Sequence, residues 1–474
     1  MQSLRPFPLA RLASDPSHLP PEQALRRVLG GRRPVLLDGA SNADGLGRYS
    51  YAACDPTAHY VLPQVPDFAR LQQPADQSAH FFSADARGVQ VQAPAAFAFA
   101  DLQRFVDACH PQIAIGLLDY ELGRASERLP QRAAAAGLGT AAIDFAAYDA
   151  LYRYDAHTQQ ADVLAVDADA AERLRRYLRV VPPPLPPLIC GPLSSDFSPQ
   201  QHAQAVAAIS DRLLAGDCYQ VNLCRTLRAK LPTASIVPAY LRLRSCAPAP
   251  LAAFLRLDGV DALSPTSPTL LSNTPELFLQ IDWSQPRVET RPIKGTRPRG
   301  TDADSDARWQ HELMQSRKDQ AEHVMIVDLL RNDLGRIARP GTVAVEGFLR
   351  CVSLPTVHHL VSTVSATPAP GIGLAQLLHA TFPGGSITGA PKVAAMQLID
   401  ALEPRRRGPF YGALGWLSRN GGTLALCIRT AIATADELVL AVGGGIVLDS
   451  TPAEEWAETE AKAAAFSRAL TTTP

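Results

Sequence analysis

A proline-rich segment divides this chain soon after its first third. Residues 181–188 read VPPPLPPL and hold five prolines. Proline lacks a backbone N–H and has a fixed φ, so the run excludes a helix and favours an extended connector. A chain of 474 residues can bury one large core, or a core with a smaller companion. We therefore predict an N-terminal mixed α/β region over 1–180, a connector over 181–193 and a second unit over 194–474.

Helical and strand patterns occur on both sides of the connector. Helices are predicted at 20–29, 101–109, 198–216 and, continuous or broken, 306–337. Ser198 is the expected N-cap of the third helix and Gly216 its stop. An Ala-rich tract over 133–143 fits either a helix or a loop. Strands are predicted at 34–37, 114–118, 145–154, 218–227, 342–349, 356–364, 410–418, 423–433 and 437–442.

The balance of charge excludes whole classes of partner. The 45 Lys and Arg against 46 Asp and Glu leave no basic surplus for a nucleic-acid backbone or an anionic membrane. No apolar run is long enough to cross a bilayer, and the first residues lack the apolar core of a signal peptide. The eight cysteines form no CxxC pair. We expect a cytoplasmic protein with no nucleic-acid or membrane partner.

The C-terminal helix carries a candidate site. Residues 451–454 (TPAE) match a capping box with proline at the first helical position, so a helix starts there. Helical spacing then places Glu455, Glu458 and Lys462 on one face. A salt-bridged, solvated face is one interpretation. The glycine run 443–445 just upstream favours a ligand site instead, because absent side chains let a ligand approach the backbone closely.

A second helix can supply another carboxylate. The sequence KDQAEHVMIVDLLRNDLGR (318–336) places Glu322 beside an apolar stripe. Mg²⁺ prefers hard oxygen ligands and keeps several waters for an anion to replace. Glu322 and Glu455 would make a suitable pair. Spacing alone leaves ordinary helix-surface salt bridges as the alternative.

Lysine is rare here, and one lysine is placed like a reagent. Only five of the 45 basic residues are lysine, the side chain that can act as a base or nucleophile. Lys294 lies in ETRPIKGTRPRG (289–300), where burial or the cations Arg291 and Arg297 would favour loss of its proton. Glu276, in SNTPELF, would serve as proton donor if its pKa is raised. A basic, anion-binding loop is the alternative.

Two further segments suit an anionic ligand. PGGSITGAPK (383–392) is not a phosphate loop, because Ala390 rather than lysine follows Gly389, yet Ser386 and Thr388 offer hydroxyl donors. Arg429 is a lone guanidinium among apolar residues, and such an arginine usually has a carboxylate partner. A protein carboxylate and a substrate carboxylate cannot be distinguished at this point.

Together these segments resemble the chorismate-utilising enzymes, in order and in wording. The resemblance implies an α+β fold like that of anthranilate synthase component I: a large two-layer antiparallel β-sandwich surrounded by helices, with the active site in a cleft. The segments that carry it are GDCYQVNL (216–223), TPELF (274–278), ETRPIKGTRPRG, KDQAEHVMIVDLLRNDLGR, VHHLVSTV (357–364), FPGGSITGAPK, YGALGW (411–416), LCIRTA (426–431), GGGIV (443–447) and DSTPAEEWAETEAKA (449–463).

Two positions imply the reaction within this family. Lys294 looks like the covalent nucleophile of the members that aminate carbon 4 of chorismate, where members that form anthranilate carry a small residue. Gln220 stands where the isochorismate- and salicylate-forming members place a lysine that activates water. The resemblance therefore implies formation of 4-amino-4-deoxychorismate, on the route to 4-aminobenzoate and folate. Amination at the ortho position, as in anthranilate synthase component I, is one alternative, and a non-catalytic subunit that regulates a glutaminase is the other.

The resemblance also implies the roles of individual residues. Lys294 would be the nucleophile and Glu276 the general acid. Mg²⁺ would be held through Glu322 and Glu455, with Glu458 nearby. Chorismate would be bound by Gly295, Thr296, His359, Thr388, Tyr411, Arg429, Gly443, Gly444 and Lys462.

Ammonia requires a partner. No cysteine lies in a glutaminase-like nucleophile elbow, so a separate glutamine amidotransferase subunit (component II) is implied, and a separate lyase would complete the pathway. The segment LLDGASNADG (36–45) is similar to the family's tryptophan-binding element, but Gly39 replaces the usual serine. This replacement argues against tryptophan binding.

Overall fold

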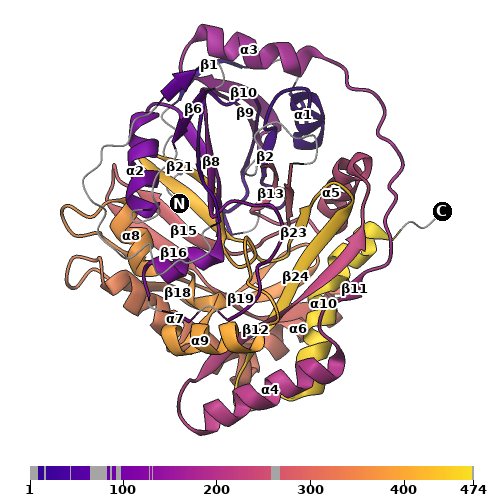
Figure 1. Ribbon diagram of the computed structural model, residues 1–474, viewed down its shortest axis with the longest axis vertical. Helices are drawn as coiled ribbons and strands as arrows, with labels where there is room; N and C mark the ends of the chain where they lie inside the picture. The colour runs from indigo at the N-terminus through magenta and orange to yellow at the C-terminus, as the bar shows by residue number, and fades with distance from the viewer. Residues whose placement is uncertain are drawn as a thin grey trace.

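Two large β-sheets packed against each other form the centre of the molecule (Figure 1). Every strand pair is antiparallel except β4 with β6, so the predicted α+β class with a two-layer antiparallel sandwich is confirmed. The computed structural model describes residues 9–14, 18–42, 44–64, 83–85, 88–91, 98–127, 129–130, 132–257 and 267–471.

Each sheet contains twelve strands within this described part. The first follows the order β1 (Ala10–Ser14), β10 (Gln160–Ala165), β9 (Ala150–Asp155), β3 (Tyr49–Ala53), β2 (Val35–Asp38), β13 (Ala252–Arg256), β14 (Thr269–Ser272), β23 (Thr430–Ala433), β24 (Glu437–Ile446), β12 (Gln220–Lys230) and β11 (Ser194–Ser195), with β20 (Gly389–Ala390) beside β12. The second follows the order β17 (Ile293–Pro298), β19 (Val357–Ala366), β16 (Arg287–Arg291), β15 (Leu277–Asp282), β22 (Gly421–Leu426), β21 (Ala413–Ser418), β7 (Ile113–Leu118), β8 (Ile143–Tyr148), β4 (Ala58–Leu62), β6 (Gly88–Val91) and β5 (Ser83–Asp85), with β18 (Ala344–Ser353) beside β19.

Strands of the first sheet are apolar on both faces because both faces are covered. Successive side chains of a strand point to opposite faces. In β13, Leu255 joins the core shared with Leu414 of the second sheet, while its neighbour Phe254 joins the core under the outer helices. Leu270 and Leu271 of β14 divide in the same way. The first sheet is therefore the middle layer on this side of the molecule.

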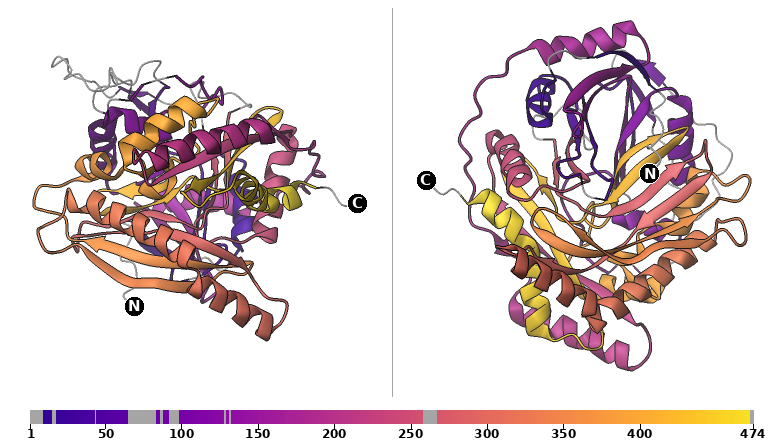
Figure 2. Two further views of the ribbon diagram at one scale, coloured as in Figure 1. Left: turned by 90° about the horizontal axis from the view of Figure 1, so that it is seen from below. Right: turned by 180° about the vertical axis from the view of Figure 1, so that it is seen from behind.

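Helices cover the outer faces (Figures 1 and 2). The first sheet is covered by α1 (Pro21–Val28), α3 (Ala168–Arg179), α5 (Ile236–Cys246) and α10 (Pro452–Leu470). The second is covered by α2 (Ala98–Ala108), α6 (Ala303–Gln315), α7 (Arg317–Gly335) and α8 (Leu374–Thr381). α4 (Pro199–Leu214) and α9 (Lys392–Leu402) pack near one end of β12. None of the helices in the described ranges is long and apolar enough to span a membrane.

The predicted helix signals agree with the observed helices. Ser198 caps α4 through a reciprocal box with Gln201. The long helix predicted over 306–337 is broken: α6 ends at Gln315, and Ser316 then caps α7 by accepting from the backbone N–H of Asp319. The tract 133–143 is a loop up to the start of β8.

Two of the predicted strands each correspond to two observed strands, which lie in different sheets. The prediction over 145–154 covers the end of β8 in the second sheet and β9 in the first. The prediction over 423–433 covers β22 in the second sheet and β23 in the first. The chain crosses between sheets at Asp149 and at 427–429, where Arg429 adopts a φ of 48°. Apolar patterning continues across such crossings because both sheets face the same core, so periodicity misses them.

The proline-rich connector joins parts of one structure. Residues 181–193 contain no helix or strand and run over the outside of the molecule from α3 towards α4 (Figures 1 and 2). Strands from both sides of the connector pair directly, β2 with β13 and β7 with β21. The predicted N-terminal region and second unit therefore share both sheets.

Candidate active site

Three glycines of β24 provide the bare backbone surface over which the predicted site residues meet. A Cβ built on Gly444 would lie 2.9 Å from Oε2 of Glu455 and 3.5 Å from Oε1 of Glu458. A Cβ on Gly443 would lie 2.6 Å from the hydroxyl oxygen of Tyr411. A side chain at position 444 would occupy the space beside Glu455 and Glu458 of α10, and one at position 443 the space beside Tyr411, as expected for a strand that a ligand approaches closely.

Lys294 reaches the same surface from the other sheet. A Cβ on Gly445 would lie 3.0 Å from Nζ of Lys294 and 2.5 Å from Nε2 of Gln220. The side chain of Gln220 is fully buried, and neither of its polar atoms has a hydrogen-bond partner among the described residues. An unpaired buried amide costs free energy unless a ligand or water satisfies it. Lys294 and Gln220 therefore border a polar site at Gly445.

A β-bulge directs Lys294 towards the site. The pairing of β17 with β19 shifts register between Lys294 and Thr296, and Gly295 between them has a φ of +69°. The two cations expected to act on Lys294 are engaged elsewhere. Arg291 pairs with Glu289 at 2.8 Å and Arg297 with Glu312 at 2.8 Å. Their charges are therefore largely neutralised by their own partners.

Glu276 is a buried carboxyl group suited to proton transfer. It is 5 % exposed, and Oε1 accepts a hydrogen bond of 2.6 Å from the hydroxyl of Ser386. Burial raises its pKa to about 7, against the opposing effects of the Ser386 bond and the Lys294 ammonium. A carboxyl group with a pKa near neutrality can both give and take a proton. Glu276 therefore has the raised pKa that a proton donor at this position requires.

His359 is neutral and has one free acceptor. Its Nδ1 lies 3.2 Å from the carbonyl oxygen of Gly295 and 3.0 Å from Oγ1 of Thr296. Because a carbonyl only accepts, Nδ1 carries the proton. Burial, with the nearby Arg429, lowers the pKa of His359 to about 3. Nε2 is buried and finds no partner in the described part of the chain, so it is available to accept from a ligand.

Arg429 and Tyr411 are held in unusual backbone conformations. Their φ angles are 48° and 62°, in a region that residues other than glycine rarely adopt. Burial lowers the pKa of Arg429, an effect that Glu276 opposes. No hydrogen bond or ion pair joins the Arg429 guanidinium to another described side chain. Strain of this kind gathers at functional sites, where the surrounding structure imposes it.

The three carboxyl groups predicted to serve a metal lie on α7 and α10. Glu455 is 3 % exposed; Oε1 accepts from Ser450 at 2.6 Å, while Oε2 is buried without a partner in the described ranges. Burial, then Glu458, raises the pKa of Glu455. Burial also raises the pKa of Glu322, where Lys294 opposes the shift and Glu458 adds to it. Repulsion from Glu458 thus contributes to the raised pKa of both Glu455 and Glu322.

Lys462 orders the third carboxylate. Its Nζ lies 2.6 Å from Oε1 of Glu458 and donates to the carbonyl oxygen of Gly443 at 2.7 Å. Burial raises the pKa of Glu458, but the attraction and hydrogen bond of Lys462 outweigh it, with help from Lys294, so the net shift is downward. The face predicted on α10 thus contacts the glycine strand through Lys462, while the Glu458 side chain remains 48% exposed.

The carboxylates fit a hard divalent cation. No group of three His, Cys, Asp or Glu side chains in the described residues is arranged to hold a metal by itself. Mg²⁺ needs only one or two protein carboxylates, since water and substrate oxygens complete its shell. The unpartnered Oε2 of Glu455, beside Glu458 and Gly444, is such a donor. Glu322 lies close enough to respond to Glu458.

The loop 383–392 contributes Ser386 more directly than Thr388. The Ser386 hydroxyl donates to Glu276, as described above. Thr388 is fully buried and its hydroxyl donates to the carbonyl oxygens of Gly384 and Gly385, at 3.0 and 3.2 Å. The Thr388 side chain therefore stabilises its own loop, and its predicted contact with substrate stays a prediction.

One buried residue was absent from the sequence-based set. Arg407 lies 2 % exposed behind Tyr411, its guanidinium carbon 4.5 Å from the centre of the tyrosine ring. The only signal in the sequence is an arginine run, 405–407, followed by Gly408. A run of this kind is usually a solvated surface, so patterning gave no reason to choose it.

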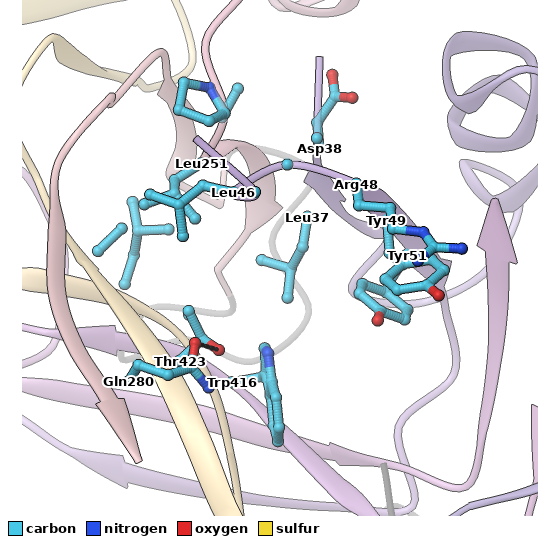
Figure 3. A pocket seen from close by; sticks show the side chains of 18 of the residues that line it. Leu37, Asp38, Leu46, Arg48, Tyr49, Tyr51, Leu251, Gln280, Trp416 and Thr423 are labelled. Atoms are coloured by element: carbon cyan, nitrogen blue, oxygen red, sulfur yellow. Dashed lines mark hydrogen bonds between the residues drawn. The ribbon is translucent and has the colours of Figure 1, made fainter. Parts of the chain in front are cut away.

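A separate cavity of about 190 Å³ lies between the two sheets (Figure 3). It is lined by Leu46, Leu251 and Trp416 among others, and by none of the predicted site residues. Its ionisable groups are engaged: Asp38 with Arg244 at 2.7 Å, Arg48 with Asp155 at 2.7 Å, and Arg153 with Asp162 at 2.5 Å. Leu37, Asp38, Gly39 and Gly45 form part of its lining, so the element that carries Gly39 lies at this cavity.

Comparisons with known proteins identify relatives of this chain. The chain is 39% identical to an aminodeoxychorismate synthase component 1 of Klebsiella aerogenes over 356 residues, which cover 74% of this chain and 76% of that protein. It is 35% identical to an anthranilate synthase component 1 of Haloarcula marismortui over 399 residues, 78% of this chain and 79% of that one.

Among solved structures, an anthranilate synthase component I of Streptococcus pneumoniae superposes with a TM-score of 0.72 at 25% identity, covering 89% of this chain and 92% of that chain. The predicted component I fold is thereby confirmed. The model of a family described as chorismate binding enzymes matches residues 58–468, which include every residue of the site above. This chain belongs to the chorismate binding enzyme family.

Proposed function

We propose that this protein converts chorismate and ammonia to 4-amino-4-deoxychorismate and water. The observation that carries the proposal is the meeting of the Lys294 amine with the bare strand at Gly445, close enough to Glu276 to oppose the rise in its pKa. A nucleophile and an acid are thus placed together in a site lined by a carboxylate pair. The similarity to the Klebsiella aerogenes protein, whose name describes this reaction, supports the choice.

Each residue has a distinct part in binding. The ring acid of chorismate would lie over Gly443 and Gly444, with Arg429 as partner for its remaining carboxylate. Mg²⁺ held by Glu455 and Glu322, with Glu458 nearby, would neutralise a substrate carboxylate and fix its orientation. Nε2 of His359, which has no partner among the described residues, would accept from a substrate hydroxyl.

The chemistry is two substitutions, each with a shift of both conjugated double bonds of the ring. Unprotonated Lys294 attacks carbon 2, the double bond between carbons 1 and 2 moves to carbons 1 and 6, the one between carbons 5 and 6 moves to carbons 4 and 5, and the bond from carbon 4 to its hydroxyl breaks. Glu276 gives its proton to that hydroxyl, which leaves as water. Ammonia then bonds to carbon 4, both double bonds return to their original positions, and the bond from carbon 2 to Lys294 breaks, which releases the neutral amine. The new ammonium group returns a proton to Glu276, and both residues are restored.

Ammonia would come from a separate glutamine amidotransferase subunit. The name "component 1" of the Klebsiella aerogenes relative indicates that it is one component of a larger enzyme, and this supports the same arrangement for the present chain. Gln220 lies buried beside Lys294, with both of its polar atoms unpartnered among the described residues. An amide side chain cannot take a proton from water, so position 220 would supply no base to activate water as a nucleophile. Ammonia needs no such base, because it is already a nucleophile.

Product analysis tests the proposal. The protein is incubated with chorismate, Mg²⁺ and an ammonium salt, and the products are separated by liquid chromatography. We expect 4-amino-4-deoxychorismate, and a covalent adduct on Lys294 by mass spectrometry of the trapped enzyme. Anthranilate as the product would instead establish ortho amination and overturn the proposal.

A lysine variant tests the non-catalytic alternative. Lys294→Ala should abolish product formation, whereas Lys230→Ala, at an exposed end of β12, should not. Equal product formation by wild type and Lys294→Ala would exclude covalent catalysis by this lysine.

A further inference from the structure

Behind the active site, one buried guanidinium joins three parts of it. Arg407 lies between the rings of Tyr120 and Tyr411, 4.8 and 4.5 Å from their centres. Its charge is matched by Glu403, which is also buried, through bonds of 2.7 Å from Nη2 and 3.0 Å from Nε. A bidentate pair fixes the plane of a guanidinium as well as its charge.

The first part of the site held by Arg407 is the strand opposite Gly445. Nη2 donates to the backbone carbonyl of Asn222 at 2.8 Å. Asn222 is the register partner of Gly445, two residues after Gln220 on β12. Glu403 adds a second anchor by accepting from the backbone N–H of Cys224 at 2.9 Å.

The second part is the loop that bonds to Glu276. Nη1 of Arg407 donates to the carbonyl oxygen of Ile387 at 2.7 Å. Ile387 follows Ser386, whose hydroxyl donates to Glu276 at 2.6 Å. The position of that hydroxyl therefore depends on the peptide that Arg407 holds.

The third part is Tyr411, whose ring stacks on the guanidinium and whose hydroxyl adjoins Gly443. Tyr411 has a φ of 62°, and a tyrosine in that conformation needs surrounding contacts to hold it there. The ring of Tyr120 covers the opposite face of the Arg407 guanidinium. The backbone N–H of Arg407 donates to the side chain of Glu121 at 3.1 Å. Arg407 is thus fixed from every side.

We propose that Arg407 is a positioning residue for the reaction, which holds β12 at Asn222, the Ser386 loop and Tyr411 in one geometry around the substrate. This inference rests on the proposed function, because Glu276 is there the acid. A buried ion pair is weak evidence for stability, since apolar substitutes often serve as well. Planar donors that end on two parts of one site, with the third part stacked on the face of the same guanidinium, are what an apolar pair could not supply.

The variant Arg407→Lys separates position from charge. Lysine keeps a cation beside Glu403, so the fold is expected to persist, but a single amine cannot reach Glu403, Ile387 and Asn222 with the planar fork. We expect kcat to fall by about 100-fold, as when a group is misplaced by about 1 Å, with a smaller change in KM. Circular dichroism and the melting temperature establish that the variant is folded.

The pH profile supplies a readout that lost stability alone would not move. Ser386→Ala removes a hydrogen bond to ionised Glu276, so the alkaline limb of the kcat profile should move to higher pH. Arg407→Lys should move the same limb in the same direction, because the Ser386 loop loses its anchor. Two results would overturn the proposal. One is a kcat of Arg407→Lys within about twofold of wild type. The other is an alkaline limb that moves in Ser386→Ala but stays in place in Arg407→Lys.

A matched control is Arg244→Lys. Arg244 also pairs with a buried carboxylate, Asp38, at 2.7 Å, and Asp38 lies at the separate cavity between the sheets. We expect a lower melting temperature with kcat and pH profile unchanged. A shifted profile in this control would show that any lost buried pair perturbs the site, which would also overturn the proposal.

Failure of the proposed function would be distinguishable. If wild type forms anthranilate, the reaction assigned above is wrong, and the Arg407→Lys comparison still holds as a ratio of rates. If wild type forms no product, chorismate binding is measured by calorimetry with Mg²⁺. An affinity in Arg407→Lys equal to that of wild type would then refute the positioning role, and an affinity at least tenfold weaker, with Arg244→Lys unchanged, would support it.

Discussion

Nζ of Lys294 lies 3.0 Å from the point at which a Cβ on residue 445 would project, so Gly445 leaves open the space in front of the amine. The same Cβ would lie 2.5 Å from Nε2 of Gln220. Both are ends of flexible side chains, so an alanine would displace them from the substrate rather than prevent folding. Glycine at 445 is therefore a condition for the reaction.

Gly445→Ala should lower kcat/KM by about 100-fold, because the nucleophile is moved from its approach to carbon 2. Steady-state kinetics and thermal melting would check this. Gly335→Ala on α7 is the control, since a Cβ there would meet nothing within 4 Å. An active Gly445→Ala variant that still forms the Lys294 adduct would contradict the expected role of the amine.

Activity should fall as pH rises through about 7. Burial raises the pKa of Glu276 from its ordinary value of 4.5 to about 7, so the carboxyl group is protonated and able to donate below that pH. The same shift stabilises the fold below pH 4.5 and is lost as pH rises through about 7, because ionisation is unfavourable in the buried site. Ser386→Ala should raise the pKa further. A kcat profile without an alkaline limb, or one unchanged in Glu276→Gln, would exclude Glu276 as the acid.

Glu455→Gln should weaken Mg²⁺ binding by at least about tenfold, since even partners outside the metal's own shell contribute that much. The measurement is the Mg²⁺ concentration for half-maximal activity, with the Mg²⁺-induced rise in melting temperature as a second readout. Because the pKa of Glu455 is raised, protons should also compete with Mg²⁺ at low pH. Glu454→Gln, one residue earlier and exposed, is the control. Equal Mg²⁺ requirements in both variants would refute the assignment.

Tryptophan should neither inhibit this protein nor raise its melting temperature. The ionisable groups that line the cavity between the sheets, Asp38, Arg48 and Arg153, are all paired within the protein, which leaves no partner for an amino acid's charges. Calorimetry and thermal melting with millimolar tryptophan would check this, and saturable binding would disprove it.

The packing around Gly39 extends that prediction. A Cβ on Gly39 would lie 2.1 Å from the carbonyl oxygen of Gly47, so the family's usual serine does not fit this backbone. Gly39→Ser should lower the melting temperature through a forced shift of the backbone, and an unchanged melting temperature would show that the loop adapts freely.

Local chemistry in the sequence was sufficient for the helix ends. Ser198 and Thr451 cap α4 and α10 as predicted, because an N-cap depends on a few neighbouring residues. Local chemistry did not predict where the chain passes from one sheet to the other, as at Arg429. The position of such a crossing depends on which distant segments pack on each face of the sheets. The same reason explains why Arg407 was missed: its partners Asn222 and Glu403 lie far from one another in the sequence.

The order of motifs in the sequence by itself determined the family. It also predicted the amine at position 294 as nucleophile and the acidic residues that would hold a metal. Only the tertiary structure decided that Arg291 and Arg297 are paired away from Lys294, and that Ser386 rather than Thr388 bonds to Glu276. A residue's chemistry is a property of its type. Its pKa, its free hydrogen-bonding atoms and its neighbours are properties of what folding brings around it, and burial is set by distant segments that no local pattern records.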